Sequence, residues 1–199
     1  EAGGPPLPRA ISRGGGHFSS PVWSPDEKSL AYLRIERAAT EILIAALDSG
    51  EERPLARLTP GDYGFDVRLL DWSADGRYLV VSHSSLPGEP AGLVLVPLAG
   101  GANRQLTAPS DIVGGDFEPR FSPDGRTISF IRYISRSHQE LFVVPSAGGA
   151  PRQLTSDGKQ ISSQDWTPDG RNLVIASSRE GVYRLWRLRA GAAEPGPTL

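Results

Sequence analysis

The sequence predicts an all-β fold, a β-propeller of four-stranded antiparallel blades, with four blades in this chain. One short phrase recurs as WSPDEK, WSADGR, FSPDGR and WTPDGR, and its aromatic residues lie 49, 49 and 45 positions apart, at Trp23, Trp72, Phe121 and Trp166. The apolar residues that follow each copy alternate with a period of two, which is the period of a β-strand. Four strands in each unit of this length, repeated in tandem, are the composition of a propeller blade.

The recurring phrase predicts the turn that joins the first strand of each blade to the second. Proline fixes φ at the first central position of such a turn, an aspartate side chain caps it, and glycine accepts the positive φ that follows. The aspartate is present in all four copies, as Asp26, Asp75, Asp124 and Asp169. We therefore interpret these aspartates as turn caps rather than metal ligands, and the aromatic residue before each turn as a wedge between neighbouring blades.

The other strands of each blade follow the turn in order. The second strand carries apolar residues seven and nine positions after the aromatic residue, at Leu30 and Tyr32, Leu79 and Val81, Ile128 and Phe130, and Leu173 and Ile175. The third strand is expected at EILIAAL, GLVLVPL, ELFVVPS and RLWRL. A short fourth strand is expected at Arg57-Leu58-Thr59, Gln105-Leu106-Thr107 and Gln153-Leu154-Thr155, with a degraded copy at Pro197-Thr198-Leu199.

The repeat divides the chain into consecutive segments. Residues 1–12 are expected to form a linker and the outer strand of a preceding blade, and the four blades are expected to span 13–59, 60–107, 108–155 and 156–199. Three closures are compatible with four blades: an arc of a larger propeller, two chains that complete an eight-bladed ring, or four blades that close alone. Because an open arc is expected to expose two apolar blade faces, we favour part of a larger ring or an oligomer-closed ring.

The composition narrows the classes of partner. The chain has 199 residues and a formal net charge of −2, which gives no field that attracts nucleic acid or an anionic membrane. It has no cysteine, which fits the cytosol and a bacterial periplasm equally well. No apolar run of about 18 residues occurs, so no membrane span is expected. The chain lacks methionine and begins at Glu1, from which we expect it to be a segment of a longer protein.

Two stretches of the third unit, EPRFSPDGRTISFIR and ELFVVPSAGGAPRQLT, carry a family resemblance. With the matching stretches of the other units, they resemble the TolB-type WD-like repeat from about residue 8 to residue 199. The stretch SSREGVYRLWRL is similar to blades in the C-terminal half of CadC-type winged-helix bacterial regulators. The resemblance implies a propeller that is usually six-bladed, and either a TolB-like periplasmic component or the sensor or assembly part of a bacterial regulator. It favours the periplasm over the cytoplasm.

Recognition residues are expected on the side of the disc where the units differ. The turns of the recurring phrase and the Ala-Gly-Gly turns share one side. The loops between second and third strands share the other side with the inter-blade loops, and these loops differ from unit to unit, so this side is free to bind a protein or peptide partner. Tyrosine and arginine are enriched at interface hot spots. The expected contacts are Tyr63, Phe65, Arg132, Tyr133, Arg136, His138, Arg179 and Tyr183.

The innermost strands direct a second set of residues toward the central channel. The residues just before the aromatic positions include Asp71, Arg120 and Asp165, and Glu118 lies two positions before Arg120. Carboxylates of this kind at a channel mouth are of the type that binds cations, but solvation or pairing with Arg120 is the commoner arrangement. We therefore expect no metal and no cofactor at the channel mouth.

Catalysis has little support in the sequence. It contains no G-x-S-x-G elbow, no H-E-x-x-H motif and no phosphate-binding glycine loop. The three histidines occupy different registers of the repeat, so the repeat does not bring them together. The main hypothesis is a non-catalytic module for protein or peptide binding. The alternatives are an accessory propeller of a prolyl-oligopeptidase-type serine peptidase, with its catalytic domain outside this chain, and a small-molecule site in the central channel.

Overall fold

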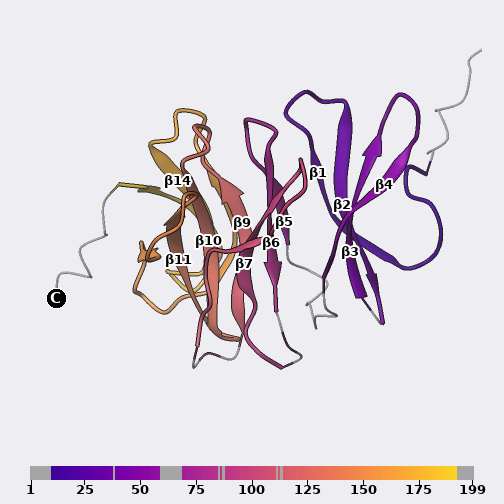
Figure 1. The fold of residues 1–199 in the computed structure, drawn as a ribbon. Helices are drawn as coiled ribbons and strands as arrows, with labels where there is room; N and C mark the ends of the chain where they lie inside the picture. Colours follow the sequence, from indigo (N-terminus) through magenta and orange to yellow (C-terminus); the bar gives the residue numbers. More distant parts are fainter. Residues whose placement is uncertain are drawn as a thin grey trace, which may run out of the picture.

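The computed structural model describes residues 10–37, 39–58, 69–84, 86, 88–110, 112 and 114–191, and their regular elements are all β-strands. The strands form four separate antiparallel sheets, each made from strands that follow one another along the chain. The sheets stand side by side in chain order, from the indigo sheet at one end to the orange and yellow sheet at the other (Figure 1). The fold is therefore a β-propeller arc of four blades, as the repeat predicts.

The first three sheets have four strands each, and the last has three among the described residues. The first sheet contains β1 (His17–Trp23), β2 (Ser29–Glu36), β3 (Ala39–Ala46) and β4 (Glu52–Leu58). The second contains β5 (Leu70–Trp72), β6 (Tyr78–His83), β7 (Gly92–Pro97) and β8 (Arg104–Gln105). The third contains β9 (Gly115–Phe121), β10 (Thr127–Ser135), β11 (His138–Pro145) and β12 (Arg152–Gln153). The fourth contains β13 (Ile161–Trp166), β14 (Asn172–Ser177) and β15 (Arg184–Arg189).

The outer strands of the second and third blades end earlier than the sequence suggests. β8 and β12 stop at the glutamine of each Gln-Leu-Thr stretch, and the threonine side chain then takes the place of a backbone partner. Thr107 Oγ1 accepts a hydrogen bond from Leu93 N at 2.8 Å, and Thr155 Oγ1 accepts one from Leu141 N at 2.9 Å. The expected strand at Pro197-Thr198-Leu199 and most of the expected strand within residues 1–12 lie outside the described residues.

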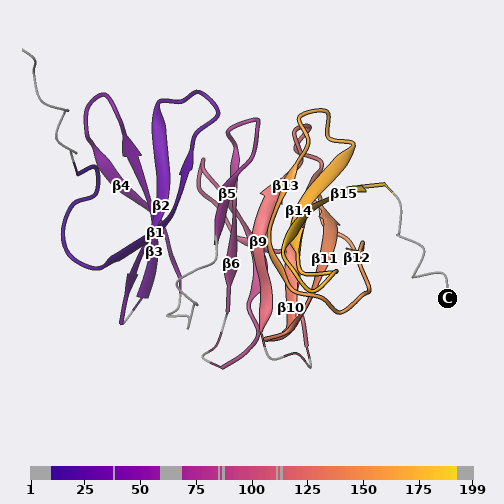
Figure 2. The ribbon, with the colours of Figure 1, turned by 180° about the vertical axis from the view of Figure 1, so that it is seen from behind.

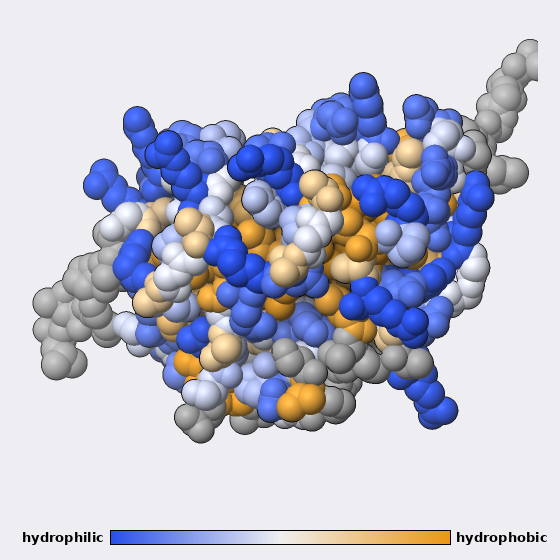
Figure 3. Space-filling model, viewed as in Figure 1, coloured by the Kyte–Doolittle hydropathy of each residue, from blue (hydrophilic) through white to orange (hydrophobic). Residues whose placement is uncertain are grey.

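Apolar side chains fill each gap between neighbouring blades, because the strands alternate and each sheet presents an apolar row on both faces. We call the face of each sheet that contacts the next sheet along the chain its back, and the opposite face its front. The back of one sheet packs against the front of the next at three interfaces. The second strands contribute alternating pairs such as Ala31 and Leu33 to the back and Leu79 and Val81 to the front. Figure 3 shows hydrophobic residues gathered in the middle of this side of the molecule, with hydrophilic residues around the rim.

The four turns of the recurring phrase have the same hydrogen bonds, which confirms the interpretation of the aspartates as caps. In every copy the serine or threonine hydroxyl two residues earlier donates to the aspartate Oδ1 at 2.5–2.7 Å. The backbone N–H two residues later donates to the same oxygen at 3.0–3.1 Å. The next residue after the aspartate has positive φ in all four turns, 60° at Glu27 and 66–72° at the three glycines.

The two ends of the arc differ from the expectation of two exposed apolar faces. At the first blade, the outward-facing Tyr32, Leu43 and Ala45 are buried and form a small apolar cluster of their own. At the fourth blade, which Figure 2 shows at the opposite end, the outward-facing Leu185 is 77 % exposed, and exposed Arg187 lies beside it in the strand. One end is thus covered, and the other is open but partly charged. No helix among the described residues has the length and apolar character that a membrane crossing requires.

Candidate functional site

On the side of the arc that carries the recurring turns, the capping aspartates have a structural role. Each capping aspartate receives two hydrogen bonds from its own turn, both at Oδ1, which fix the carboxylate in the position of a turn cap. The hydroxyl of Ser73 and the backbone N–H of Arg77 lower the pKa of Asp75 to about 2. Equivalent hydrogen bonds lower the pKa of Asp26, Asp124 and Asp169. These carboxylates are ionised turn caps at any pH near neutrality.

The structure brings together three of the four residues expected at the channel mouth. The guanidinium of Arg120 lies between two carboxylates from neighbouring blades, with Nη1 at 3.9 Å from Asp71 Oδ1 and Nη2 at 3.9 Å from Asp165 Oδ2. Asp71 Oδ2 also accepts a hydrogen bond from Phe121 N at 2.8 Å. These groups link the second, third and fourth blades through their innermost strands, so pairing with Arg120 is the arrangement that the structure contains.

Glu118 occupies a different environment from Arg120. It is buried with φ of 55°, and Ser20, at the equivalent position of the first blade, has φ of 53°. The backbone carbonyl of Glu118 accepts a hydrogen bond from Gln164 Nε2 at 2.7 Å, which ties the third blade to the fourth. Among the described residues, no group of three or more His, Cys, Asp or Glu side chains is arranged to hold a metal ion.

Arg132, one of the expected partner contacts, is engaged inside its own blade. Its guanidinium donates to Asp116 at 2.7 and 2.9 Å, and Asp116 is completely buried. The same guanidinium lies 4.6 Å from the centre of the Phe142 ring, within the range of a cation–π contact. These contacts account for the charge and the position of Arg132 without any partner molecule.

Tyr133 follows Arg132 on β10 and packs against the apolar cluster between the third and fourth blades. Its ring makes an edge contact with Phe117 at a centroid distance of 5.3 Å. Burial, then the negative charge of Glu118 and the neighbouring Tyr183, raise the pKa of Tyr133 to about 12. Tyr133 is therefore neutral near pH 7 and lies near Tyr183, another expected contact.

His138 adjoins an inter-blade segment, residues 156–160, that joins the third blade to the fourth. His138 Nε2 is 3.0 Å from Glu140 Oε1, and that oxygen accepts a hydrogen bond from Gly158 N at 2.7 Å. The second oxygen of Glu140 accepts the hydroxyl of Thr155 at 2.5 Å. Glu140 is buried and anchors the segment 156–160 through its bond with Gly158 N, whereas the side chain of His138 is partly exposed at the surface.

Two further expected contacts hold the other side of the same segment. Arg179 Nε lies 2.8 Å from Asp157 Oδ2, and the hydroxyl of Tyr183 donates to Gln160 Oε1 at 3.2 Å. We call the surface of residues 135–138, 156–160 and 178–183 the loop face. It contains His138, Arg179, Tyr183 and the exposed Arg136. Tyr63 and Phe65 lie outside the described residues.

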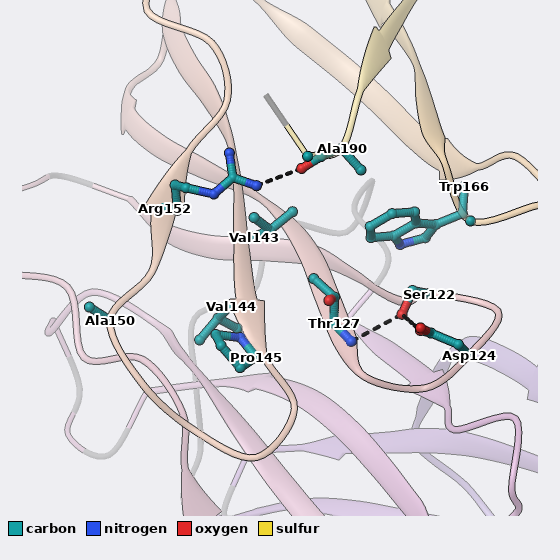
Figure 4. Close-up of a pocket in the computed structure, with 12 residues that line it drawn as sticks. Ser122, Asp124, Thr127, Val143, Val144, Pro145, Ala150, Arg152, Trp166 and Ala190 are labelled. Atoms are coloured by element: carbon teal, nitrogen blue, oxygen red, sulfur yellow. Dashed lines mark hydrogen bonds between the residues drawn. The ribbon is translucent and has the colours of Figure 1, made fainter. Parts of the chain in front are cut away.

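A groove between the third and fourth blades opens on the side of the recurring turns (Figure 4). It has a volume of about 470 Å³ and is lined by Val143, Pro145 and Trp166, among others. Arg152 Nη2 donates to the carbonyl of Ala190 across the groove at 2.5 Å. The corresponding arginine of the preceding blade, Arg104, donates in the same way to Ser146 O and Ala147 O at 2.6 and 2.5 Å. The groove is thus a recurring seam of the fold rather than a site of distinct chemistry.

The residues that sequence reasoning missed are the buried polar groups at the blade junctions, which include Asp116, Glu140 and Gln164. Gln164 accepts the hydroxyl of Ser129 at 2.8 Å and donates to the carbonyl of Glu118, both in the preceding blade. One sequence signal was available, for Asp116. Asp116 is an acidic residue near the start of β9, at a position where the other units carry apolar residues, whereas Glu140 has a glutamate counterpart, Glu41, at the same register of the first unit.

Comparison with known proteins agrees with this architecture. The family model described as TolB beta propeller domain matches residues 7–194. The uncharacterized protein Atu1656 of Agrobacterium fabrum is 29 % identical over 176 residues, which cover 86 % of this chain and 55 % of that protein. Dipeptidyl-peptidase 5 of Trichophyton equinum is 35 % identical over 82 residues, which cover 40 % of this chain and 11 % of that protein. This chain spans little more than half of the first relative and a small part of the second.

Solved structures show the same arrangement of blades. A TolB structure from Agrobacterium tumefaciens has a TM-score of 0.70 at 24 % identity, and the match covers 91 % of this chain and 61 % of that one. TolB from Acinetobacter baumannii has a TM-score of 0.73 at 20 % identity, over 94 % of this chain and 44 % of that one. These likenesses concern the fold. With the family match over almost its whole length, the chain belongs to the TolB β-propeller domain family.

Proposed function

We propose that this chain is a non-catalytic propeller module that binds a protein or peptide partner through the loop face. The observation that carries the proposal is the anchoring of residues 156–160 on both sides, by Glu140 and by Arg179 and Tyr183. This anchoring joins three loops of different sequence into one surface. Tyr183 on that surface is 53 % exposed, and exposed Val182 lies next to it.

The physical case rests on preorganisation. Loops that are already held by hydrogen bonds lose less conformational freedom when a partner binds, so more of the contact energy appears as affinity. Tyrosine and arginine at the centre of such a surface are the residue types that contribute most to interface energetics. Tyr133, Arg136, His138, Arg179 and Tyr183 remain the proposed contacts, whereas the ion pair with Asp116 already accounts for Arg132. Tyr63 and Phe65 remain proposed contacts from the sequence alone.

Family membership supports a bacterial setting for this module. The bacterial periplasm is proposed over the cytoplasm, with the chain acting as a TolB-like component or as the sensor or assembly part of a CadC-type regulator. The match covers 61 % and 44 % of the two TolB chains, which supports closure of the ring by further blades or by another subunit.

A second candidate is the accessory propeller of a prolyl-oligopeptidase-type serine peptidase. The 82-residue match to dipeptidyl-peptidase 5 favours it, although that match covers only 11 % of the relative. In this case the catalytic serine lies in a separate domain outside this chain. Labelling of the natural protein by a fluorophosphonate probe, which reacts with activated serines, would favour this second candidate over the first.

Site-specific photo-crosslinking tests the proposed surface. A photoreactive phenylalanine analogue is placed at Tyr183 on the loop face and, as a matched control, at Arg171 on the side of the recurring turns. Both positions are exposed. In the source cells we expect a discrete crosslinked protein from position 183 and none from position 171. Equal crosslinking from both positions, or crosslinking from 171 alone, would contradict the proposal.

A further inference from the structure

The buried amide of Gln139 joins two of the loops that form the loop face. Its Nε2 donates to the carbonyls of Ser135 and Arg136 at 3.2 and 2.9 Å, which fixes the hairpin between β10 and β11. Its Oε1 accepts a hydrogen bond from Ile161 N at 3.0 Å, and its backbone N–H donates to the carbonyl of Lys159 at 3.3 Å. The backbones of Arg136 and Lys159 are therefore held close together by one buried residue.

The side chains of Arg136 and Lys159 carry charges that the protein does not neutralise. Both residues are exposed. Neither makes an ion pair within the part of the chain that the structure describes. The chain as a whole has a formal net charge of −2, so this pair of cations gives the loop face a character that the average composition does not have.

The two carboxylates of the loop face are both paired with other residues. Asp157 Oδ2 lies 2.8 Å from Arg179 Nε, and Glu180 Oε2 lies 2.6 Å from Arg184 Nη1. Because each acidic group already has its own basic partner, the surface keeps a local surplus of positive charge. A partner that supplies carboxylates would complement this surface, whereas a partner that supplies cations would be repelled.

An apolar patch adjoins the two cations. The Tyr183 hydroxyl donates to Gln160 Oε1 at 3.2 Å, and the carbonyl of Gln160 accepts a hydrogen bond from Ser178 N at 3.1 Å. Gln160 is the neighbour of Lys159 in the chain, so these bonds place the tyrosine beside that cation. Tyr183 and Val182 are each more than half exposed, which offers apolar area next to the positive charge.

We propose that the segment bound by the loop face is acidic, with two carboxylates that pair with Arg136 and Lys159 and an apolar side chain that packs on Val182 and Tyr183. Arginine binds a carboxylate through two parallel hydrogen bonds, which fixes the direction of the segment as well as its charge. This inference rests on the proposed function, because it concerns the same surface and names the chemistry of its partner.

A membrane or a nucleic acid fits this arrangement less well than a peptide. Binding to a polyanion grows with the number of phosphates that the protein neutralises. Two cations beside paired carboxylates neutralise few phosphates, and an exposed tyrosine and valine add apolar contact that phosphates do not use. A peptide with two acidic residues and one apolar residue matches the number and the kind of groups present.

Peptide selection on the whole natural protein tests this assignment. A phage library of random short peptides is selected on the wild type and counter-selected on Y183A, so that the retained peptides are those that need the loop face. We expect these peptides to carry paired Asp or Glu residues beside an apolar residue. Retained peptides that are neutral or basic would overturn the inference.

Charge reversal on a retained peptide gives the second readout, measured by fluorescence anisotropy. R136E and K159E are each expected to raise the dissociation constant about ten-fold, because a carboxylate then faces a carboxylate. A peptide in which one acidic residue is replaced by lysine is expected to recover affinity for one of these variants. R171E, the same charge change on the side of the recurring turns, should leave the dissociation constant unchanged.

The failure of this inference differs from the failure of the proposed function. A crosslink from position 183 that R136E and K159E leave unchanged would overturn the acidic partner but keep the loop face as a binding surface. If selection retains no peptide, the inference is overturned, and the crosslink from position 183 decides separately on the proposed function. Sedimentation of the wild type with phosphatidylglycerol vesicles, abolished by R136E and K159E, would assign the cations to a membrane and overturn the peptide assignment.

Discussion

Arg132 and Asp116 form a bidentate ion pair between β10 and β9, with Nε 2.7 Å from Oδ1 and Nη2 2.9 Å from Oδ2. Asp116 is completely buried, and its backbone N–H donates to the carbonyl of Ala91 in the preceding blade at 2.7 Å. The pair therefore sits at a junction where the third blade is held to the second. It gives Arg132 a structural role, although the sequence places this residue among the partner contacts.

Removal of one member of this pair is expected to destabilise the fold. Asp116→Asn keeps the shape of the side chain but leaves the guanidinium of Arg132 without a counter-charge in a half-buried site. The free energy of unfolding should fall by about 3 kcal/mol, as it does when buried ion pairs lose one partner. Urea denaturation measures the change. The exposed Arg136→Ala serves as control and should stay within about 0.5 kcal/mol of wild type; equal effects of the two variants would contradict the structural role.

The first recurring turn carries a backbone penalty that the other three avoid. Glu27 has φ of 60° at the position where Gly76 has 72°. A residue with a Cβ pays about 1–2 kcal/mol in this left-handed region, and part of that is offset by the entropy that glycine loses on folding. Glu27→Gly is therefore expected to raise the free energy of unfolding by about 1 kcal/mol, measured by chemical denaturation.

The reverse change at the equivalent turn provides the control. Gly76→Ala should lower the free energy of unfolding by about 1 kcal/mol. No heavy atom lies within 4 Å of the position that a Cβ at Gly76 would take, so steric contact does not contribute to the loss. A destabilising Glu27→Gly would show that the Glu27 side chain makes contacts that outweigh its backbone strain.

The sequence predicted the parts of the fold that depend on local interactions. The bonds of Asp124 to Ser122 and to Arg126 N span two residues each, so a short phrase contains all that they need. The strands followed from their alternating apolar residues for the same reason. The sequence overestimated the length of the fourth strands of the second and third blades. It does not show that Thr107 and Thr155 accept hydrogen bonds from the neighbouring strand through their side chains.

The candidate site was predictable only in part, because its geometry depends on contacts between blades. The sequence placed His138, Arg179 and Tyr183 in loops of the same side, and the structure brings all three to residues 156–160. It could not show that β10 extends to Ser135, which draws Arg132 into the blade beside Asp116. Nor could it identify Glu140, whose partner Gly158 lies on the segment that leads to the next blade.

The loop face depends on Glu140, and this dependence can be measured by hydrogen exchange. Glu140→Gln replaces one acceptor oxygen by a donor, so the bonds from Gly158 N and from the Thr155 hydroxyl cannot both be kept as they are. The amide of Gly158 is expected to exchange about ten-fold faster, which corresponds to the loss of one hydrogen bond. The exposed Glu180→Gln, which affects only the pair with Arg184, should leave this amide unchanged. Unaltered exchange in Glu140→Gln would show that other contacts hold the segment.

The stability of the fold is expected to decrease as the pH falls below about 6.5, and His83 is a defined contributor. Burial lowers the pKa of His83 in the folded chain below its ordinary value of 6.5. Just below this pH the unfolded chain binds a proton at His83 that the folded chain does not, so acid favours unfolding. The contribution is fully present above the unfolded pKa and is lost as the pH falls toward the folded pKa.

Denaturation of His83→Gln between pH 5 and pH 8 tests this assignment. The variant should show a smaller slope of unfolding free energy against pH than the wild type, because the proton uptake on unfolding at this position is gone. His17→Gln, which removes another histidine from an exposed position at the start of β1, is the matched control for the substitution itself. A slope in His83→Gln equal to that of the wild type would assign the acid sensitivity to groups other than His83.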